Sequence, residues 1–239
     1  NVLHLNAHEL DPGTRQKVAL GRAIVRENIN ALILDEPLTN VPPEDRMKVR
    51  LAIKNVRKAC KITMIFVTHD QSEALSMSEK VAIMKDGQIL QYDERDTIYE
   101  RPKNTFIAHF IGYPGMNLLL CDLRNDELDF GDFVLRDAEI AVVIKNVKRA
   151  ISNSKTSRIY FGIRPEDVRV DNKKKSGWIE FKCVESEFSE NKQILLLKKE
   201  STEIRVTTSR FDIKEGSNVY VYFPYDKIRV FDLNGDLIL

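Results

Sequence analysis

The sequence predicts an α/β domain followed by an all-β domain, and three observations lead to this prediction. In the first part of the chain, short apolar runs alternate with helical stretches. After Tyr113–Gly115, short runs of alternating polarity replace that pattern, and turn signals such as Glu215-Gly216 and Asn234-Gly235 separate some of them. We therefore expect two domains, residues 1–112 and residues 113–239, the second a small barrel or sandwich.

Three apolar runs in the first domain have the length of strands: Ala31–Leu34, Thr63–Thr68 and Val81–Met84. Such runs are typical of parallel strands that are buried on both faces. The segment Glu44–Cys60 has helical spacing, and Pro42-Pro43 before it suits the first turn of a helix. A strand, a helix and another strand in this order predict a βαβ unit in a mostly parallel sheet.

The dipeptide Asp86-Gly87 is a hairpin signal between Val81–Met84 and Ile89–Tyr92. In the second domain, runs rich in β-branched and aromatic residues predict short β-strands. The expected strands are Ala141–Lys145, Arg158–Ile163, Trp178–Phe188, Gln193–Leu197, Glu203–Thr207, Val219–Phe223 and Ile228–Phe231.

The composition argues against several classes of function. Lys and Arg total 37 and Asp and Glu total 36, so the net charge of +1 gives no reason to expect a nucleic acid partner. Cys60, Cys121 and Cys183 lie far apart without CxxC spacing, and we expect reduced thiols. No apolar run approaches the roughly 20 residues of a membrane span, and the start lacks a signal-peptide pattern. Because the chain begins without Met, inside an expected helix, we expect either a fragment or a trimmed form of a protein.

The first motif with chemical meaning is the acidic pair Asp35-Glu36, which follows the run Ala31–Leu34. The carboxyl ends of strands are where open α/β sheets bind ligands. One carboxylate there can hold Mg²⁺, directly or through water, and the next can polarise an attacking water molecule. A buried strand followed by an acidic turn would give the same short pattern.

A histidine, His69, follows the next expected strand, Thr63–Thr68. A neutral imidazole at the same sheet edge can hydrogen-bond a terminal phosphate and the attacking water. A lone histidine at a strand end is usually structural, but its position after the Asp35-Glu36 pair favours the functional interpretation.

A third segment, Glu9–Ala23, makes a family resemblance definite. The order of this segment, Leu34–Pro37 and Thr68–Asp70 resembles the ATP-binding cassette (ABC) family. The start of the segment resembles the LSGGQ signature, and Arg15–Ala23 resembles the helix that follows it. The resemblance implies ATP and Mg²⁺ as cofactors and an ATPase function.

The resemblance also assigns roles at the sheet edge. Asp35 matches the Walker B aspartate, which holds Mg²⁺ directly or through water. Glu36 matches the catalytic glutamate, and His69 matches the switch histidine. Both are therefore candidate catalytic residues.

Further segments resemble one subfamily. Asp70–Leu75, Asp96–Pro102 and Phe106–Gly112 resemble the ABC subunits that energise sugar and glycerol-phosphate importers. Phe161–Asp167 and Arg229–Asp232 resemble the C-terminal TOBE domain of that subfamily, an OB-like β domain. The fold that this implies is the C-terminal part of an ABC nucleotide-binding domain followed by a TOBE domain.

The chain departs from the family in its phosphate-binding loop. No GxxxxGK[ST] pattern occurs, and none of the ten glycines is followed by lysine. The nest of backbone N–H groups that would cradle the phosphates is therefore missing from these residues, together with its lysine. We expect the chain by itself to bind ATP poorly and to be inactive as an ATPase.

The signature is altered as well, because Leu10–Thr14 stands where the family has LSGGQ. In the family dimer this segment closes over the partner's ATP, and by resemblance the residues that would do so are Asp11, Pro12, Gly13, Thr14, Arg15 and Gln16. A proline removes one N–H donor, and a carboxylate repels phosphate. Asp-Pro is instead a good local helix start, so we expect Asp11 to cap its own helix.

The D-loop, which normally contacts the opposing protomer's ATP site, also differs from the family pattern. Where the family reads SNLD, this chain has Thr39, Asn40, Val41 and Pro42. Two altered cross-site elements in one chain predict a degenerate site in a heterodimer, whereas Asp35, Glu36 and His69 remain intact.

The resemblance implies an ATP-binding subunit of an importer that couples ATP binding and hydrolysis to uptake of a solute, and the expected solute is a compound of the sugar or glycerol-phosphate type. Its partners would be a second ABC ATPase subunit, transmembrane permease subunits and, indirectly, an extracytoplasmic solute-binding protein. It would lie peripherally at the cytoplasmic face of the plasma membrane. The alternative is a non-catalytic regulatory or scaffold protein that uses its OB-like domain.

Overall fold

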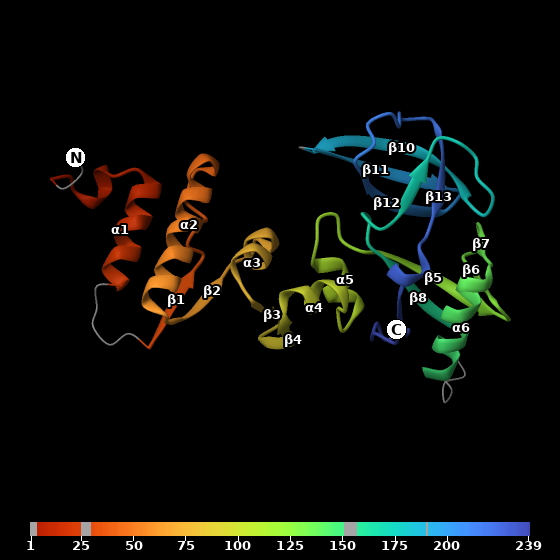
Figure 1. Cartoon of the computed structure of the whole chain (residues 1–239), viewed down its shortest axis with the longest axis horizontal. Coiled ribbons are helices and arrows are strands. Elements are labelled where there is room, and N and C mark those ends of the chain that lie inside the picture. Colours follow the sequence, from red (N-terminus) through yellow and green to blue (C-terminus); the bar gives the residue numbers. More distant parts are fainter. Residues whose placement is uncertain (1–3, 25–29, 151–156, 190) are drawn as a thin grey trace. The chain divides into compact units, whose positions relative to one another are not determined.

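The computed structural model describes residues 4–24, 30–150, 157–189 and 191–239. It is an α/β structure with several sheets. The chain divides into two compact units, Asn1–Val81 and Ala82–Leu239, and the elements of each are labelled in Figure 1. The domain boundary at residues 112 and 113 stays a prediction.

The first unit is built around one strand–helix–strand motif, as the sequence predicts. Its elements are η1 (Ala7–Glu9), α1 (Pro12–Ile24), β1 (Ala31–Asp35), α2 (Pro43–Cys60), β2 (Thr63–Val67) and α3 (Gln71–Met77). Strands β1 and β2 pair in parallel, with Asp35 opposite Val67. Helix α2 begins at Pro43, whose missing N–H is not needed in a first turn, and ends at Lys61 in the left-handed conformation.

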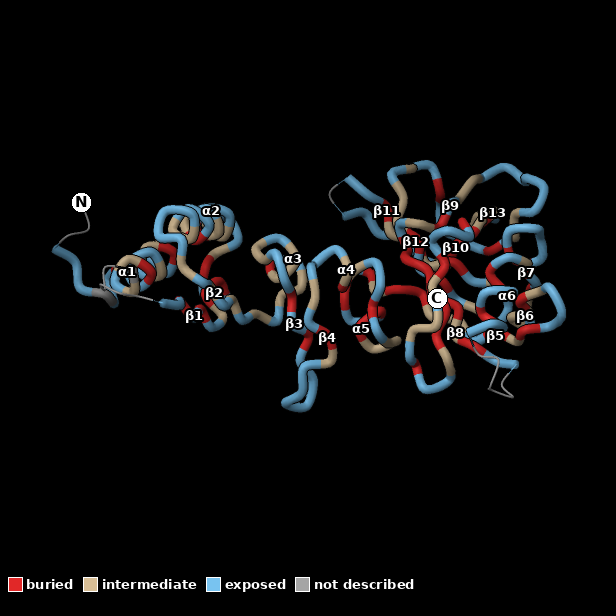
Figure 2. Tube along the Cα trace, turned by 60° about the horizontal axis from the view of Figure 1, so that its bottom comes forward, coloured by how far each residue is buried: buried red, intermediate tan, exposed pale blue. Residues whose placement is uncertain are grey.

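Only one face of the β1–β2 sheet is covered by the described residues. Leu32 and Leu34 join the core formed with α1 and α2, whereas Ile33 is 67% exposed, Ile65 49% and Val67 45%. The alternation of buried and exposed residues along β1 is visible in Figure 2. Neighbouring residues of a strand point to opposite faces, so helices on one side leave every second side chain open. The prediction that these strands are buried on both faces is therefore wrong for the described chain.

Strand β3 (Lys80–Lys85) pairs with β4 (Gln88–Glu94) in a two-stranded sheet of its own. Asp86 and Gly87 form the turn with φ of 51° and 76°, the left-handed values of a two-residue hairpin. The predicted hairpin is confirmed. The prediction that Val81–Met84 is a parallel strand of the main sheet is wrong, because the tight turn brings β4 back beside β3.

The second unit contains two five-stranded sheets. It begins with the hairpin and the short helices α4 (Arg95–Glu100) and α5 (Thr105–Phe110). The first sheet has the order β14-β8-β5-β6-β7: Arg229–Phe231, Arg158–Ile163, Asn117–Arg124, Glu127–Asp129 and Val134–Leu135. The second has the order β12-β11-β10-β13-β9: Thr202–Thr208, Lys192–Lys199, Ile179–Ser189, Asn218–Tyr222 and Arg169–Asp171.

One hydrophobic core joins the two sheets and helix α6 (Ala138–Ala150). Phe161 of β8 is fully buried and makes edge-to-face contacts with Phe130 and Phe223. Phe133 stacks on Phe130. Aromatic pairs of this kind add to the stabilisation that burial itself provides.

Helix α6 corrects the prediction of a strand over Ala141–Lys145. Ile140, Val143, Ile144 and Val147 are buried at helical spacing. Asp137 stabilises the start, because its carboxylate accepts a hydrogen bond from the Ile140 N–H at 2.8 Å. The β-branched composition favours a strand locally, but the burial pattern shows that the helical period decides the structure.

The buried Arg164 holds α4 and α5 to the end of β8 within the second unit. The residue is 4% exposed, and its guanidinium donates to the carbonyl oxygens of Tyr99 at 2.7 Å and Ala108 at 3.0 Å, and also to that of Ile111. It also lies over the Tyr99 ring, 4.1 Å from the centroid. Carbonyl dipoles and a ring face compensate a cation that burial would otherwise make costly.

Within the described part of the chain, no helix combines the length and the apolar character that crossing a membrane requires.

Candidate functional site

The site lies where the parallel strands β1 and β2 end. The register places Asp35 opposite Val67, and the N–H of Glu36 donates to the carbonyl oxygen of Val67 at 2.9 Å. The ladder therefore continues one residue beyond β1. Because both strands run in the same direction, the residues that follow them meet at one sheet edge.

Glu36 and His69 are in direct contact at this edge. The carboxylate oxygen Oε1 of Glu36 lies 2.7 Å from His69 Nδ1 and accepts a hydrogen bond from the His69 N–H at 2.9 Å. Glu36 has a φ of 46°, an uncommon left-handed conformation for a residue with a side chain. Such conformations persist when the surroundings fix them, and they cluster at functional sites.

Thr39 holds the other oxygen of the same carboxylate. Its hydroxyl donates to Glu36 Oε2 at 2.8 Å, and its N–H donates to the Glu36 carbonyl oxygen at 3.3 Å. Both oxygens of Glu36 are therefore engaged. The resemblance places Thr39 at a partner's ATP, and it does not predict a contact of Thr39 with Glu36. The signal that could have suggested this contact is the spacing, because Thr39 follows Glu36 by three residues.

The rest of the altered D-loop builds the start of α2. Val41 is 3% exposed and contributes to the core, and the carbonyl oxygen of Pro42 accepts the first N–H bonds of the helix. Arg46 Nε donates to the Val41 carbonyl oxygen at 3.1 Å. Asn40 is exposed. These residues serve the first unit itself in the described structure.

A network behind His69 fixes the turn between β2 and α3. Asp70 caps α3, accepting from the N–H groups of Ser72 at 2.8 Å and Glu73 at 3.1 Å. The Thr68 hydroxyl donates to Glu73, which is 4% exposed and lies 3.7 Å from Arg50 of α2. A buried carboxylate needs such partners, so Glu73 ties the turn that carries His69 to α2.

Hydrogen bonding shifts the pKa of both contact residues in opposite directions. The bonds from His69 first, and then from Thr39, hold the pKa of Glu36 below its ordinary value of 4.5. The bond with Glu36 raises the pKa of His69 above 6.5. Each charged form is stabilised by the other, so the pair favours an ionised carboxylate, the form that a general base requires.

Asp35 is exposed, and its side chain makes no hydrogen bond or ion pair with the described residues. The same residues contain no cluster of three or more His, Cys, Asp or Glu side chains that could hold a metal ion. Mg²⁺ in phosphoryl-transfer sites is typically held by one or two carboxylates together with substrate phosphates. An uncommitted carboxylate such as Asp35 fits that kind of site.

The signature segment caps its own helix, as the sequence predicts. The N–H of Thr14 donates to Asp11 Oδ1 at 2.8 Å, and that of Arg15 donates to the Asp11 carbonyl oxygen at 2.9 Å. The bonds from Thr14 lower the pKa of Asp11. Helix α1 begins at Pro12, and a Cβ on the buried Gly13 would lie 3.3 Å from both Asp11 and Asp45. The Thr14 N–H, a donor that the helix itself leaves free, is therefore already satisfied within the chain.

The remaining signature residues differ in their surroundings. Arg15 donates to the Leu10 carbonyl oxygen at 3.0 Å, and Gln16 is partly buried. Among the described residues, no hydrogen bond or ion pair joins this segment to Glu36 or His69. Tertiary structure thus brings Glu36 and His69 into contact after β1 and β2, and it places Gly13 of the signature segment beside Asp45 in the first turn of α2.

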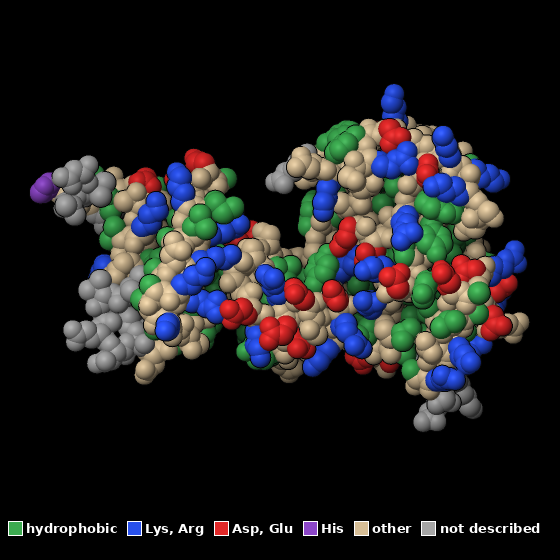
Figure 3. Space-filling model, in the orientation of Figure 1, with side chains coloured by type: hydrophobic (Ala, Val, Ile, Leu, Met, Phe, Trp, Pro, Cys, Tyr) green, Lys and Arg blue, Asp and Glu red, His purple; other side chains and the backbone are tan. Residues whose placement is uncertain are grey.

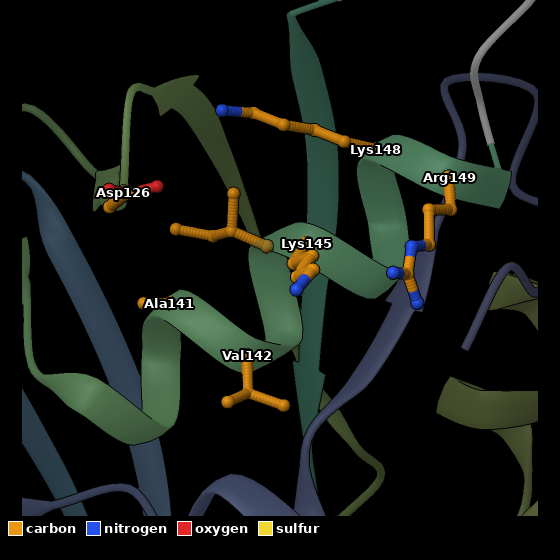
Figure 4. A pocket seen from close by; sticks show the side chains of 7 residues that line it. Asp126, Ala141, Val142, Lys145, Lys148 and Arg149 are labelled. Carbon is orange, nitrogen blue, oxygen red and sulfur yellow. The ribbon is translucent and has the colours of Figure 1, made fainter.

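A second place to consider is an open hollow of about 570 Å³ beside α6, lined by Asp126, Ala141, Val142, Ile144, Lys145, Lys148 and Arg149 (Figure 4). Lys148 extends toward the side of Asp126, whereas Arg149 points away from it. Lys148 donates to the Asn125 carbonyl oxygen. Cations in the last turn of a helix complement its dipole, which explains these side chains without a ligand. On the face shown in Figure 3, basic and acidic side chains are interspersed.

Curated relatives match almost the whole chain. The trehalose/maltose import ATP-binding protein MalK of Thermococcus litoralis is 36% identical over 245 residues, 97% of this chain and 63% of MalK. The oligosaccharides import ATP-binding protein MsmX of Bacillus subtilis is 34% identical over 235 residues, 96% of this chain and 63% of MsmX. The putative uncharacterized ABC transporter ATP-binding protein YcjV of Escherichia coli is 32% identical over 231 residues, with 96% and 62% covered. The chain spans a little under two thirds of these relatives.

No family model matches the chain. Among solved structures, the cytoplasmic molybdate-binding protein ModG with molybdate bound matches 48% of this chain and 95% of its own. The sequence identity is 9% and the TM-score 0.38, a similarity too small to bear on fold or function.

Proposed function

The chain is related along nearly its whole length to ATP-binding proteins of ABC transporters, and on that premise we propose that it is part of the ATP-hydrolysing subunit of a solute importer. The observation that carries this proposal is the contact of Glu36 with His69 where β1 and β2 end. Residues 1–112 would then be the C-terminal part of an ABC nucleotide-binding domain. Residues 113–239 would form an OB-like TOBE domain.

In this proposal Glu36 is the general base. Hydrogen bonds from His69 and Thr39 hold its pKa below the ordinary value and stabilise the carboxylate, which would orient and polarise the attacking water. His69, in contact with Glu36, would donate a hydrogen bond to the terminal phosphate. Asp35 would hold Mg²⁺, which supplies charge neutralisation of the phosphates when it is bound.

The cradle for the phosphates has to come from residues outside this sequence, which contains no GxxxxGK[ST] pattern. The open face of the β1–β2 sheet supports this requirement. Parallel sheets are covered on both faces, yet Ile33, Ile65 and Val67 are exposed here. A segment that carries a phosphate-binding loop and covers this face would complete both the sheet and the site.

The altered cross-site elements support an asymmetric partnership. Asp11 caps α1, and its carboxylate would repel a partner's γ-phosphate at the place where that phosphate would otherwise cap the helix. We therefore propose a second, different ABC ATPase subunit as partner. If Asp11→Ser strengthens nucleotide-dependent dimerisation, the self-capping role is supported, and no effect would count against it.

The relatives named above include importers of trehalose, maltose and oligosaccharides, so a sugar is the proposed class of solute. Transmembrane permease subunits would then be direct partners, and an extracytoplasmic solute-binding protein an indirect one. The subunit would act at the cytoplasmic face of the membrane. Solute specificity would lie in those partners.

The proposal is tested on the chain joined to a segment that carries a phosphate-binding loop. Such a protein should hydrolyse ATP, and Glu36→Gln should lower kcat by about 10²-fold or more while ATP still binds. The matched control is Glu44→Gln, an exposed glutamate in the first turn of α2, which should leave kcat unchanged. Persistent turnover of the Glu36→Gln protein would refute the role of Glu36.

A further inference from the structure

We propose that Thr39 is a positioning residue that fixes the carboxylate of Glu36 at the end of the sheet. This inference rests on the proposed function of Glu36 as general base. The observation behind it is that two different residues hold the two oxygens of the Glu36 carboxylate. Oε1 is held by the backbone and ring of His69 at 2.9 and 2.7 Å, and Oε2 by the Thr39 hydroxyl at 2.8 Å.

The Thr39 hydroxyl restrains the second oxygen of the carboxylate, to which His69 makes no bond. A glutamate side chain has three rotatable bonds, so bonds to one oxygen fix a single point of the carboxylate while combined rotations can still swing the other oxygen. A second donor on the other oxygen removes that freedom and sets the plane of the carboxylate. A base must be held in a narrow range of orientations to act on water.

Thr39 itself is held in place by its neighbours. Leu38 is 1% exposed and Val41 3%, and the Val41 N–H donates to the Leu38 carbonyl oxygen at 3.1 Å. The Thr39 N–H also donates to the Glu36 carbonyl oxygen. A β-branched residue has few side-chain rotamers, so a turn anchored on both sides of Thr39 aims its hydroxyl at Glu36.

This role differs from contact with a partner's ATP, which the resemblance implies for this segment. Here the hydroxyl is already used inside the chain, on the residue that the proposed reaction depends on. Because the Thr39 hydroxyl bonds to Glu36, removing this hydroxyl should make the Glu36 carboxylate more mobile and slow the chemical step. It should have little effect on the affinity for ATP.

The first test uses the 239-residue chain and hydrogen exchange of the His69 amide, which donates to Glu36. Thr39→Val keeps the shape and removes the hydroxyl; Thr39→Ser keeps the hydroxyl. We expect exchange at His69 to be about fivefold faster in Thr39→Val, the size of one net hydrogen bond, and to return to the original rate in Thr39→Ser. The reference is the Glu36 amide, which donates to Val67 and should not change.

Equal His69 exchange in the original chain and in Thr39→Val would overturn the proposal. So would a change of the same size at the Glu36 reference amide, because the substitution would then have loosened the whole strand end.

The second test measures ATP turnover of the chain joined to a segment with a phosphate-binding loop. Thr39→Val should lower kcat about tenfold or more while KM for ATP stays within about twofold, and Thr39→Ser should restore kcat. Loss of turnover in Glu36→Gln with normal kcat in Thr39→Val would overturn the positioning role alone. Normal turnover in Glu36→Gln would overturn the proposed function and this role together.

Discussion

The two units of the chain differ in how completely they bury their apolar surface. In the second unit, two five-stranded sheets and α6 share one core with fully buried residues such as Phe161 and Phe181. Among the described residues of the first unit, the core joins α1, α2, one face of the β1–β2 sheet and the loop residues Leu38 and Val41, and the other face of the sheet is open. The residues proposed for chemistry lie in the first unit. Their geometry depends on short hydrogen-bonded turns rather than on a large core.

The largest effect should come from the core of the second unit. Phe161→Ala removes a fully buried ring that contacts Phe130 and Phe223, and it should lower the free energy of unfolding of that unit by about 3 to 5 kcal/mol. The matched control is Phe188→Ala, since Phe188 is 68% exposed; its cost should stay below about 1 kcal/mol. Urea unfolding measures the free energy of unfolding of both variants. Equal losses would mean that the buried ring stabilises the unit no more than the exposed ring does.

In the first unit, two neighbouring residues of β1 should behave differently. Leu34→Ala on the covered face should cost about 2 to 5 kcal/mol of unfolding free energy. Ile33→Ala on the open face should change it by no more than about 0.5 kcal/mol in this chain. When a segment with a phosphate-binding loop is supplied, Ile33→Ala should become costly. A substantial cost in the chain alone would show that the face is already covered.

A smaller effect should come from the buried cation of the second unit. Arg164→Met removes the donor that serves the carbonyl oxygens of Tyr99, Ala108 and Ile111, and should cost about 2 to 3 kcal/mol. Arg149→Met is the control, because Arg149 is an exposed residue of α6, and it should leave the free energy of unfolding nearly unchanged. Chemical denaturation of the two variants decides whether Arg164 holds α4 and α5 to β8, because equal costs would argue against it.

The smallest effect should be the pH dependence of the Glu36–His69 contact in the first unit. The lowered pKa of Glu36 gives stability that is present above 4.5 and is lost as pH falls through the lowered value. The raised pKa of His69 gives stability that is present below 6.5 and is lost as pH rises through the raised value. Both contributions are therefore present between pH 4.5 and 6.5.

Comparison with His69→Gln measures this contribution. The stability difference between the two proteins, measured by urea unfolding at a series of pH values, should be largest inside that window and should shrink on both sides of it. A difference that is constant with pH would mean that the two side chains are not coupled in solution.

The sequence predicted more of the site than of its surroundings. The order of Asp35-Glu36 and His69 after two apolar runs predicted that these residues would meet, because parallel strands end at one sheet edge. The cap by Asp11 was also predictable, since the Asp-Pro start acts within a single turn. The contact of Thr39 with Glu36 was not predicted, because it depends on the left-handed backbone of Glu36.

Local pattern by itself determined the hairpin at Asp86-Gly87 and the cap of α1, because each rests on contacts between residues close in the sequence. It also determined the order of strand, helix and strand in the first unit. Tertiary structure decided the helix over Ala138–Ala150 and the exposure of Ile33. In both cases the outcome depends on which surface is available to cover an apolar side chain. That surface comes from elements distant in the sequence, and a run of apolar residues does not specify it.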